Sequence, residues 1–206
     1  MLKIWGRTSS INVQKVMWTV EELGLAHERI DVGGPFGGLE GPEYAALNPN
    51  RLIPVLQDGA TTVWESNAIV RYLAGRYGSG GLWPEDPGVR SEADRWMDWQ
   101  LTTLQPAIGP IFLGLIRTAP EKRDMALIDA SAERLAQAMT ILDRHLAGRP
   151  FVAGDRLTMG DIPVGCVCWR YANLDVARPD LPNIATYRAR LEERPGYRAQ
   201  VMLPLV

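Results

Sequence analysis

The sequence contains little of what several common kinds of protein chemistry need. It has two cysteines, Cys166 and Cys168, and two histidines, His27 and His145, in 206 residues. Cysteines two positions apart point to different faces of a helix and do not make the Cys-x-x-Cys spacing of redox and zinc motifs. Neither histidine lies in a cluster of cysteines or carboxylates. We therefore expect structural thiols, structural or solvated histidines, no metal site and no Ser-His-Asp triad.

An excess of charge and long apolar runs are also missing. Lysine and arginine number 22 and aspartate and glutamate 24, so the formal net charge is −2. A nucleic-acid or membrane-surface protein would carry a basic excess. No segment reaches the roughly 18 apolar residues of a membrane-spanning helix, and the first residues lack the layout of a signal peptide. We expect a globular cytoplasmic protein with no nucleic-acid or membrane partner.

The first third of the chain alternates short strands with helical patterns. Residues 13–23 carry apolar side chains at a helical period and end at Gly24, and a second helix is expected after Glu65-Ser66. The expected strands are 2–5, 28–32, 51–56 and 61–64, the last two joined by the turn Asp58-Gly59, with one helical turn at 42–47. This order predicts a four-stranded mixed sheet covered by helices.

Residues 75–88 are rich in Gly, Pro and Ser, and no further strand is evident after them. Helical patterns cover 91–116, 122–146, 159–173 and 184–193. Pro106 and Pro110 must kink or split the first of these helices. Thr158-Met159-Gly160-Asp161 fits the frame of a capping box at the start of the third. We therefore expect an N-terminal α/β domain at 1–77, a linker at 78–88 and an all-α domain at 89–206.

Small polar side chains gather where the first strand ends and the first helix begins, at Thr8-Ser9-Ser10-Ile11-Asn12. Free N–H groups and the helix dipole make such a corner favourable for a negative group. Ser10 and Asn12 could equally serve only as caps of the helix.

Three further motifs follow in a characteristic order. Asn48-Pro49-Asn50 leads into Ile53-Pro54-Val55-Leu56, Trp64-Glu65-Ser66-Asn67 opens a helix, and the capping box lies in 151–161. With these motifs the whole chain resembles the cytosolic glutathione transferases, in particular bacterial members of serine type. The resemblance implies a thioredoxin-like α/β domain, an all-α domain, glutathione bound between the two and a homodimer.

The resemblance also implies which residues bind glutathione. Ser66 and Glu65 would hold the γ-glutamyl carboxylate and ammonium, and the main chain of Ile53, before a cis Pro54, would pair with the cysteinyl unit. Arg51 would bind the glycine carboxylate or face solvent. Taken without the resemblance, Glu65-Ser66 is an ordinary helix cap and Pro54 an ordinary trans proline.

The corner at residues 8–12 then has a candidate anion, the glutathione thiolate. Ser10 is the expected hydroxyl donor, Asn12 a second donor, and Ser9 the reserve. A thiol with a pKa near 8.5 must be made acidic by about 2 pKa units, which corresponds to about 2.7 kcal/mol. The first loop has neither Tyr nor Cys, which disfavours the tyrosine mechanism and members that attack through their own thiol.

The electrophile is expected between the first loop and the first long helices. Its expected lining is Trp5, Arg7, Phe36, Ile108, Ile111, Phe112 and Leu115. Arg7 is the polar exception and could contact an anionic substrate, whereas the apolar members could equally form an ordinary core. Asp94 and Asp98 lie on the helix expected at the dimer interface.

The expected function is that of a glutathione transferase that activates the glutathione thiol for attack on a hydrophobic electrophile. One alternative is a glutathione-dependent disulfide or peroxide reductase. Another is a non-catalytic binding or regulatory protein with the same fold, which the intact Glu65-Ser66 and Ile53-Pro54 argue against. The identity of the electrophile stays open, because apolar linings discriminate weakly between substrates.

Overall fold

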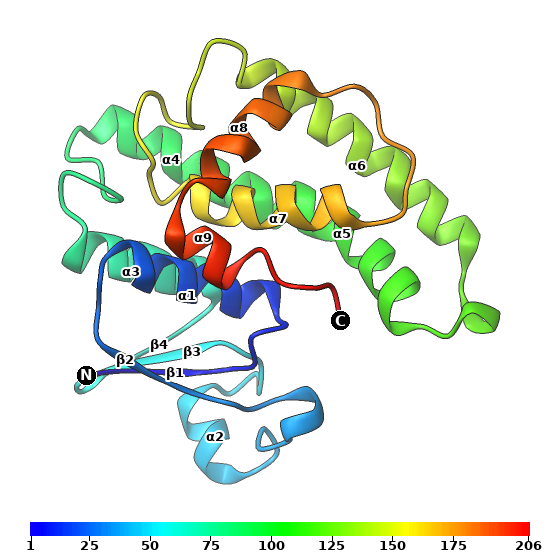
Figure 1. The fold of residues 1–206 in the computed structure, drawn as a ribbon. Coiled ribbons are helices and arrows are strands. Elements are labelled where there is room, and N and C mark those ends of the chain that lie inside the picture. Colours follow the sequence, from blue (N-terminus) through cyan, green and yellow to red (C-terminus); the bar gives the residue numbers. More distant parts are fainter.

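The computed structural model describes residues 1–206 and consists of a small α/β layer beneath a larger helical layer (Figure 1). The strands are β1 (Leu2–Trp5), β2 (His27–Ile30), β3 (Val55–Asp58) and β4 (Thr61–Trp64). They form one sheet in the order β2-β1-β3-β4, in which β1 and β2 are parallel and the other two pairs are antiparallel. This is the mixed sheet that the sequence predicts.

Both faces of the sheet are covered, by different helices. Figure 1 shows α1 (Ile11–Glu22) and α3 (Ser66–Tyr77) between the sheet and the helical layer, with α2 (Pro42–Leu47) on the opposite side. Ile4 of β1 packs with residues of α1 and α3 in one buried cluster. On the other face Val55 packs with Tyr44 of α2. Alternate residues of each strand therefore belong to different cores.

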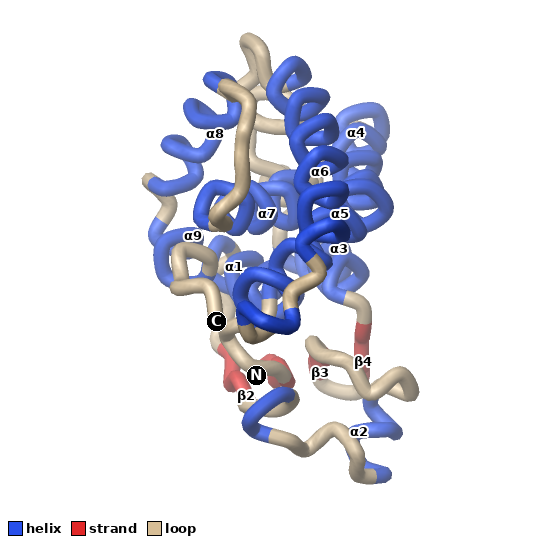
Figure 2. The backbone as a smooth tube through the Cα atoms, turned by 90° about the vertical axis from the view of Figure 1, so that its right-hand side faces the viewer, coloured by secondary structure: helices blue, strands red, loops and turns tan.

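The helical layer surrounds the largest core of the molecule. Its helices are α4 (Pro87–Trp99), α5 (Gln105–Phe112), α6 (Met125–His145), α7 (Asp161–Asn173), α8 (Pro182–Glu192) and α9 (Pro195–Gln200). The tube in Figure 2 shows them gathered above α1 and α3, away from the sheet. Ile11 and Trp18 of α1 and Val70 of α3 belong to the same buried cluster as the helical layer. None of the helices combines the length and the apolar character needed to cross a membrane.

The long helix with two prolines is divided by wide turns rather than broken. Five-residue π-helical segments, Gln100–Leu104 and Leu113–Arg117, precede and follow α5. Pro106 stands in the first turn of α5, where a missing N–H matters least, and Pro110 lies inside it. The sequence correctly predicts an interruption, but π-turns at both ends of α5 require the structure.

Several expected boundaries were wrong by a few residues. Of the strand expected at 51–56, only the part from Val55 pairs, because Pro54 has no N–H to donate to a ladder. The strand expected at 28–32 is β2, shifted to His27–Ile30. The helices expected from residues 91, 122, 159 and 184 begin at Pro87, Met125, Asp161 and Pro182. Asp86 caps α4 and Asp124 caps α6, each through its own carboxylate.

One helix, α9, was not expected at all. It has six residues and contains Gly196, a weak helix former. A methyl group at Gly196 would lie 3.0 Å from the Glu21 Cβ and 3.2 Å from the Trp18 Cδ1, so glycine allows α9 to approach α1 closely. Glycine at position 196 is thus explained by a contact with a distant segment, α1, which the local sequence does not reveal.

The cysteines and histidines have the structural surroundings that the sequence predicts. Cys166 and Cys168 are both buried in α7, and burial raises the pKa of each thiol to about 12. The His145 Nε2 lies 2.8 Å from the Val152 carbonyl oxygen, and the His27 Nδ1 lies 3.0 Å from the Leu25 carbonyl oxygen.

The predicted capping box is centred on a fully buried carboxylate. Asp161 accepts hydrogen bonds from the Thr158 N–H at 2.8 Å and the Thr158 hydroxyl at 3.1 Å. It also accepts from the Val152 N–H at 2.9 Å and the Tyr187 hydroxyl at 3.1 Å. The carboxylate therefore joins the start of α7 to the loop before it and to α8.

Candidate functional site

The corner between β1 and α1 presents a hydroxyl that the helix does not use. Ser10 is the N-cap residue of α1, yet its side chain makes no capping hydrogen bond, and it is half-buried. The first turn of α1 contains no acidic residue. Capping alone therefore does not account for Ser10, and its hydroxyl is free to donate to an anion at a positive helix end.

Asn12 joins this corner to the second motif. Its Oδ1 accepts a hydrogen bond of 3.2 Å from the Ser66 hydroxyl, so the N-termini of α1 and α3 are side by side. The Asn12 amide nitrogen makes no hydrogen bond within the protein, which leaves its two N–H donors available. The structure thus brings Ser66, which is distant in the sequence, into contact with Asn12 in the corner that also contains Ser10.

The segment before β3 has an unoccupied main-chain donor and acceptor. The Ile53-Pro54 peptide bond is cis. The Leu52 carbonyl accepts from the Tyr44 hydroxyl and the Asn48 amide, each at 2.8 Å, which ties the loop to α2. The N–H and carbonyl of Ile53 itself have no hydrogen-bond partner in the protein, so a strand-like ligand can pair with them.

Glu65 and Ser66 form the turn into α3. Glu65 has a φ of +68°, an unfavourable conformation for a residue with a side chain, and its exposed carboxylate has no partner. Such strain is concentrated at functional sites. Ser66 is buried at the first position of α3, whose first turn contains no acid. A helix end with donors for an anion therefore stands beside a carboxylate that can hold a cation.

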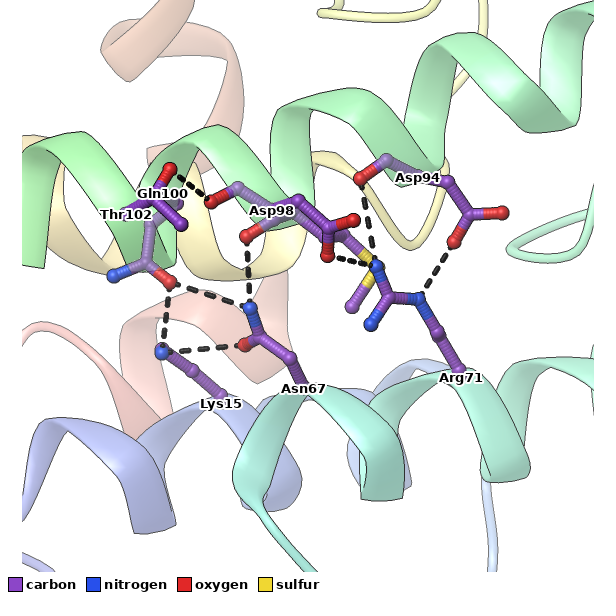
Figure 3. A network of polar contacts seen from close by, with 8 residues as sticks. Lys15, Asn67, Arg71, Asp94, Asp98, Gln100 and Thr102 are labelled. Atoms are coloured by element: carbon purple, nitrogen blue, oxygen red, sulfur yellow. Dashed lines mark hydrogen bonds and ion pairs between the residues drawn. The ribbon is translucent and has the colours of Figure 1, made fainter.

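The sequence interpretation missed Lys15, which lies fully buried beneath this turn. Its Nζ donates to the Gln100 Oε1 at 3.0 Å and the Asn67 Oδ1 at 3.3 Å (Figure 3). It also donates to the Ser66 Oγ at 3.5 Å. Burial lowers the pKa of Lys15 to about 8. The sequence contained an indication that Lys15 is buried, because it shares a helix face with Ile11, four residues before it, and Trp18, three residues after it, and both are buried.

Asp94 and Asp98 of α4 both contact one arginine. The Arg71 Nε donates to the Asp94 Oδ1 at 2.6 Å, and the Arg71 Nη2 donates to the Asp98 Oδ1 at 2.5 Å (Figure 3). These ion pairs fix α3 against α4. Both carboxylates therefore have a partner within the same chain.

Arg7 and Arg51 both lie beside the segment that follows β2, Arg7 next to Gly33 and Gly34 and Arg51 next to Glu40. Arg51 has a φ of +53°, and its Nη1 lies 3.1 Å from the Glu40 Oε2 in an exposed ion pair. Arg7 is half-buried, and a Cβ atom at Gly33 or Gly34 would lie within 3.2 Å of its side chain. Glycine at these positions therefore makes room for the Arg7 side chain. Burial and the charge of Arg117 lower the pKa of Arg7.

The residues expected to line the electrophile site lie in different surroundings. Trp5 lies on the α2 face of the sheet, where it contacts Tyr44 and donates to the Gln57 Oε1 at 2.8 Å. Ile108 and Phe112 lie in the large helical core on the other side of α1, and Phe36 is exposed. The reason is the alternation of a strand: the side chains of Ile4 and Trp5 point to opposite faces.

Phe112 has two further neighbours that the sequence interpretation missed. The Arg170 Cζ lies 3.9 Å from the ring centroid and the Arg117 Cζ 5.0 Å from it. Arg170 is only 6% exposed and makes no hydrogen bond or ion pair, and burial lowers its pKa to about 10. Arg117 donates to the Val206 carbonyl oxygen at 3.1 Å. This end of the helical layer is therefore cationic, with no acidic partner for Arg170.

Two family models match the chain. The N-terminal domain model of the glutathione S-transferases matches residues 9–76, and the C-terminal domain model of the same family matches residues 125–190.

Individual relatives match over most or all of the chain. Glutathione S-transferase GstB of Escherichia coli is 42% identical over 207 residues, which covers all of both chains. Glutathione S-transferase 3 of Zea mays is 34% identical and covers 78% of this chain and 73% of its own. Among solved structures, the glutathione-bound theta class enzyme of Xanthomonas axonopodis pv. citri has a TM-score of 0.96 and 44% identity, over 100% of this chain and 99% of that one.

Proposed function

Because the chain belongs to the glutathione S-transferase family and is a glutathione transferase, we propose that its reaction takes place at the corner formed by the N-termini of α1 and α3. In this proposal the γ-glutamyl carboxylate of glutathione accepts a hydrogen bond from the Ser66 N–H and takes the place of the Asn12 Oδ1 as acceptor of the Ser66 hydroxyl, and the glutathione ammonium contacts Glu65. The cysteinyl unit pairs with the main chain of Ile53 before the cis Pro54. The α/β domain would be 1–77, the linker 78–88 and the all-α domain 89–206.

We propose Ser10 and Asn12 as the two catalytic donors to the thiolate. The observation that carries this proposal is the free Ser10 hydroxyl, which makes no capping hydrogen bond at the end of a helix without acidic residues in its first turn. A hydrogen bond to a charged group contributes about 1.5–3 kcal/mol, and a helix terminus about 0.3–1 kcal/mol. Two donors are therefore enough to lower the thiol pKa by about 2, which requires about 2.7 kcal/mol. The thiolate then attacks an electrophilic carbon and forms a carbon–sulfur bond. With an aryl halide, the carbon–halogen bond breaks and the halide leaves with its electron pair.

The glycine end of glutathione is assigned to Arg51. Its present partner, Glu40, is in an exposed ion pair, and exposed pairs contribute only about 0–1 kcal/mol. Arg51 can therefore exchange the Glu40 carboxylate for that of the glycine unit at little cost.

For the electrophile we propose binding near Arg7 and Phe112, with Phe36 and Ile108 as further apolar neighbours. The unpaired Arg170 beside the Phe112 ring supports an electrophile that combines an apolar body with a negative charge. We also propose a homodimer in the cytoplasm, on the basis of the family.

The main alternative is a glutathione-dependent reductase. Both cysteines of the chain are buried in α7 with a pKa near 12, so a reductase of this sequence would use only the thiol of glutathione. Comparing the rate with an aryl halide to the rate with a mixed disulfide of glutathione separates conjugation from reduction.

The proposal is tested by titrating the ultraviolet absorbance of the bound thiolate. Ser10→Ala and Asn12→Ala should each raise the pKa of bound glutathione, together by about 2, whereas the neighbouring Ser9→Ala is the control and should leave it unchanged. Glutathione at millimolar concentration should raise the melting temperature of the wild-type chain. No shift in melting temperature would refute glutathione binding, and an unchanged titration in both variants would refute their role as donors.

A further inference from the structure

Lys15 is a buried cation whose hydrogen-bond partners are all neutral. Its ammonium donates to the side chains of Ser66 and Asn67 of α3 and of Gln100 in the π-helical segment, and it takes part in no ion pair. Burying an ammonium group without a negative partner is costly, because the neutral form is favoured. A folded protein that keeps this arrangement has a positive charge for which it provides no partner of its own.

The position of this charge relates it to the glutathione site. Of the three acceptors, only Ser66 also belongs to the proposed binding turn, and its Oγ lies 3.5 Å from the Lys15 Nζ. The same hydroxyl donates to the Asn12 Oδ1. An anion that is hydrogen-bonded to the Ser66 hydroxyl would therefore be separated from the Lys15 ammonium by this one hydroxyl group. At that separation two charges interact strongly in a buried site.

The charged and titratable groups around Lys15 do not include a buried negative partner. Arg170 of α7 repels it, and Glu65 at the start of α3 attracts it from an exposed position. Cys166 of α7 also faces it, but the pKa of that thiol is raised to about 12, so it is uncharged near neutral pH. Glu65 is the one acid in this set, and the proposed function assigns it to the glutathione ammonium.

Resting on the proposed glutathione site, we propose that Lys15 is a positioning residue whose buried ammonium, acting through Ser66, is the counter-charge for the γ-glutamyl carboxylate. The carboxylate supplies the negative partner that the protein lacks, so binding favours the charged form of Lys15. Because the pKa of Lys15 is lowered to about 8 without ligand, binding takes up a proton above that pH. The contribution of Lys15 to affinity is therefore full below pH 8 and is lost as the pH rises above it.

The test measures the affinity of S-methylglutathione, which has no ionisable thiol, by calorimetry. A second ligand replaces its γ-glutamyl unit with γ-aminobutyryl and so lacks only the α-carboxylate. Lys15→Gln should weaken the binding of S-methylglutathione by about 10- to 100-fold, as expected for two charges about 6 Å apart at an effective dielectric constant of 20. It should weaken the binding of the second ligand by less than about 2-fold. Lys15→Arg, which keeps the charge, should recover part of the loss.

The pH dependence gives a second readout. Between pH 7 and 9, the ratio of wild-type to Lys15→Gln affinity for S-methylglutathione should fall, and ligand ionisations cancel in that ratio. Equal losses for the two ligands, or no loss for either, would overturn the proposal in favour of a purely structural lysine. If Lys15→Gln fails to fold, a wild-type preference of less than 2-fold for the ligand with the carboxylate at pH 7 overturns it. Failure of wild-type protein to bind S-methylglutathione at all would instead refute the proposed function itself.

Discussion

Replacing Lys15 by methionine should stabilise the protein near neutral pH in the absence of glutathione. Methionine fills a similar volume and carries no charge. The pKa of Lys15 falls from 10.5 to about 8 on folding, which corresponds to about 3 kcal/mol against the charged form. The substitution also leaves the Asn67 Oδ1 without its lysine partner, at a cost of about 1–3 kcal/mol, whereas the Gln100 Oε1 keeps the Asn67 amide. The net gain expected at pH 7 is about 1 kcal/mol.

The sign and size of the pH dependence make this prediction specific. Between pH 8 and 10.5 the unfolded chain still holds the Lys15 proton whereas the folded chain has lost it, so wild-type stability rises with pH. From pH 7 to 9.5 the wild type should therefore gain about 2 kcal/mol relative to Lys15→Met, and the variant should become the less stable protein. Urea unfolding of both proteins at the two pH values measures this, with Lys3→Met, which removes an exposed lysine of β1, as the matched control. A difference between wild type and Lys15→Met that is the same at both pH values would refute the buried-cation reasoning.

Two further substitutions test contacts outside the glutathione site. Asp161→Asn keeps the shape of the side chain but loses an acceptor for the N–H groups of Val152 and Thr158, and should lower the free energy of unfolding by about 2–4 kcal/mol. Asp155→Asn, at an exposed position, is the control. A loss below about 1 kcal/mol for Asp161→Asn would contradict the role of the carboxylate. Glu22→Gln should cost about 2 kcal/mol in urea unfolding, because its nearly buried carboxylate pairs with Arg194 through two hydrogen bonds of 2.8 and 2.5 Å. A loss no larger than that of the neighbouring Glu21→Gln would show that this pair contributes little.

Most of the fold could be predicted from local patterns. The strand lengths, the turn Asp58-Gly59 and the helical periods lead to the mixed sheet and to the all-helical second part. The positions of Ser10, Asn12 and Ser66 at helix starts could also be found, because capping residues have a recognisable composition. Their proximity in space followed from the family resemblance, and the structure places the side chains of Asn12 and Ser66 in direct contact.

What could not be predicted depends on contacts between distant segments. A lysine within a helix is usually solvated, and Lys15 is buried because Gln100, on a π-helical turn 85 residues later, packs over it. The position of Trp5 on the α2 face of the sheet could not be predicted, because strand alternation fixes which residues share a face but not which face the second domain covers. The environment of Phe112 was missed for a related reason, since Arg170 comes from α7, far along the chain.

The core described above is shared by both layers, since Trp18 of α1 and Val70 of α3 are buried in the same cluster as the helices of the second half. The helices that cover the sheet thus carry two apolar faces, and cutting the chain after Tyr77 would expose one of them to water. The α/β part is therefore not a module that can be moved on its own, although its sheet is complete. Recombination between relatives at this boundary would have to exchange Trp18, Val70 and their partners in the helical layer together. The helical half can therefore diverge freely only at positions outside this shared core.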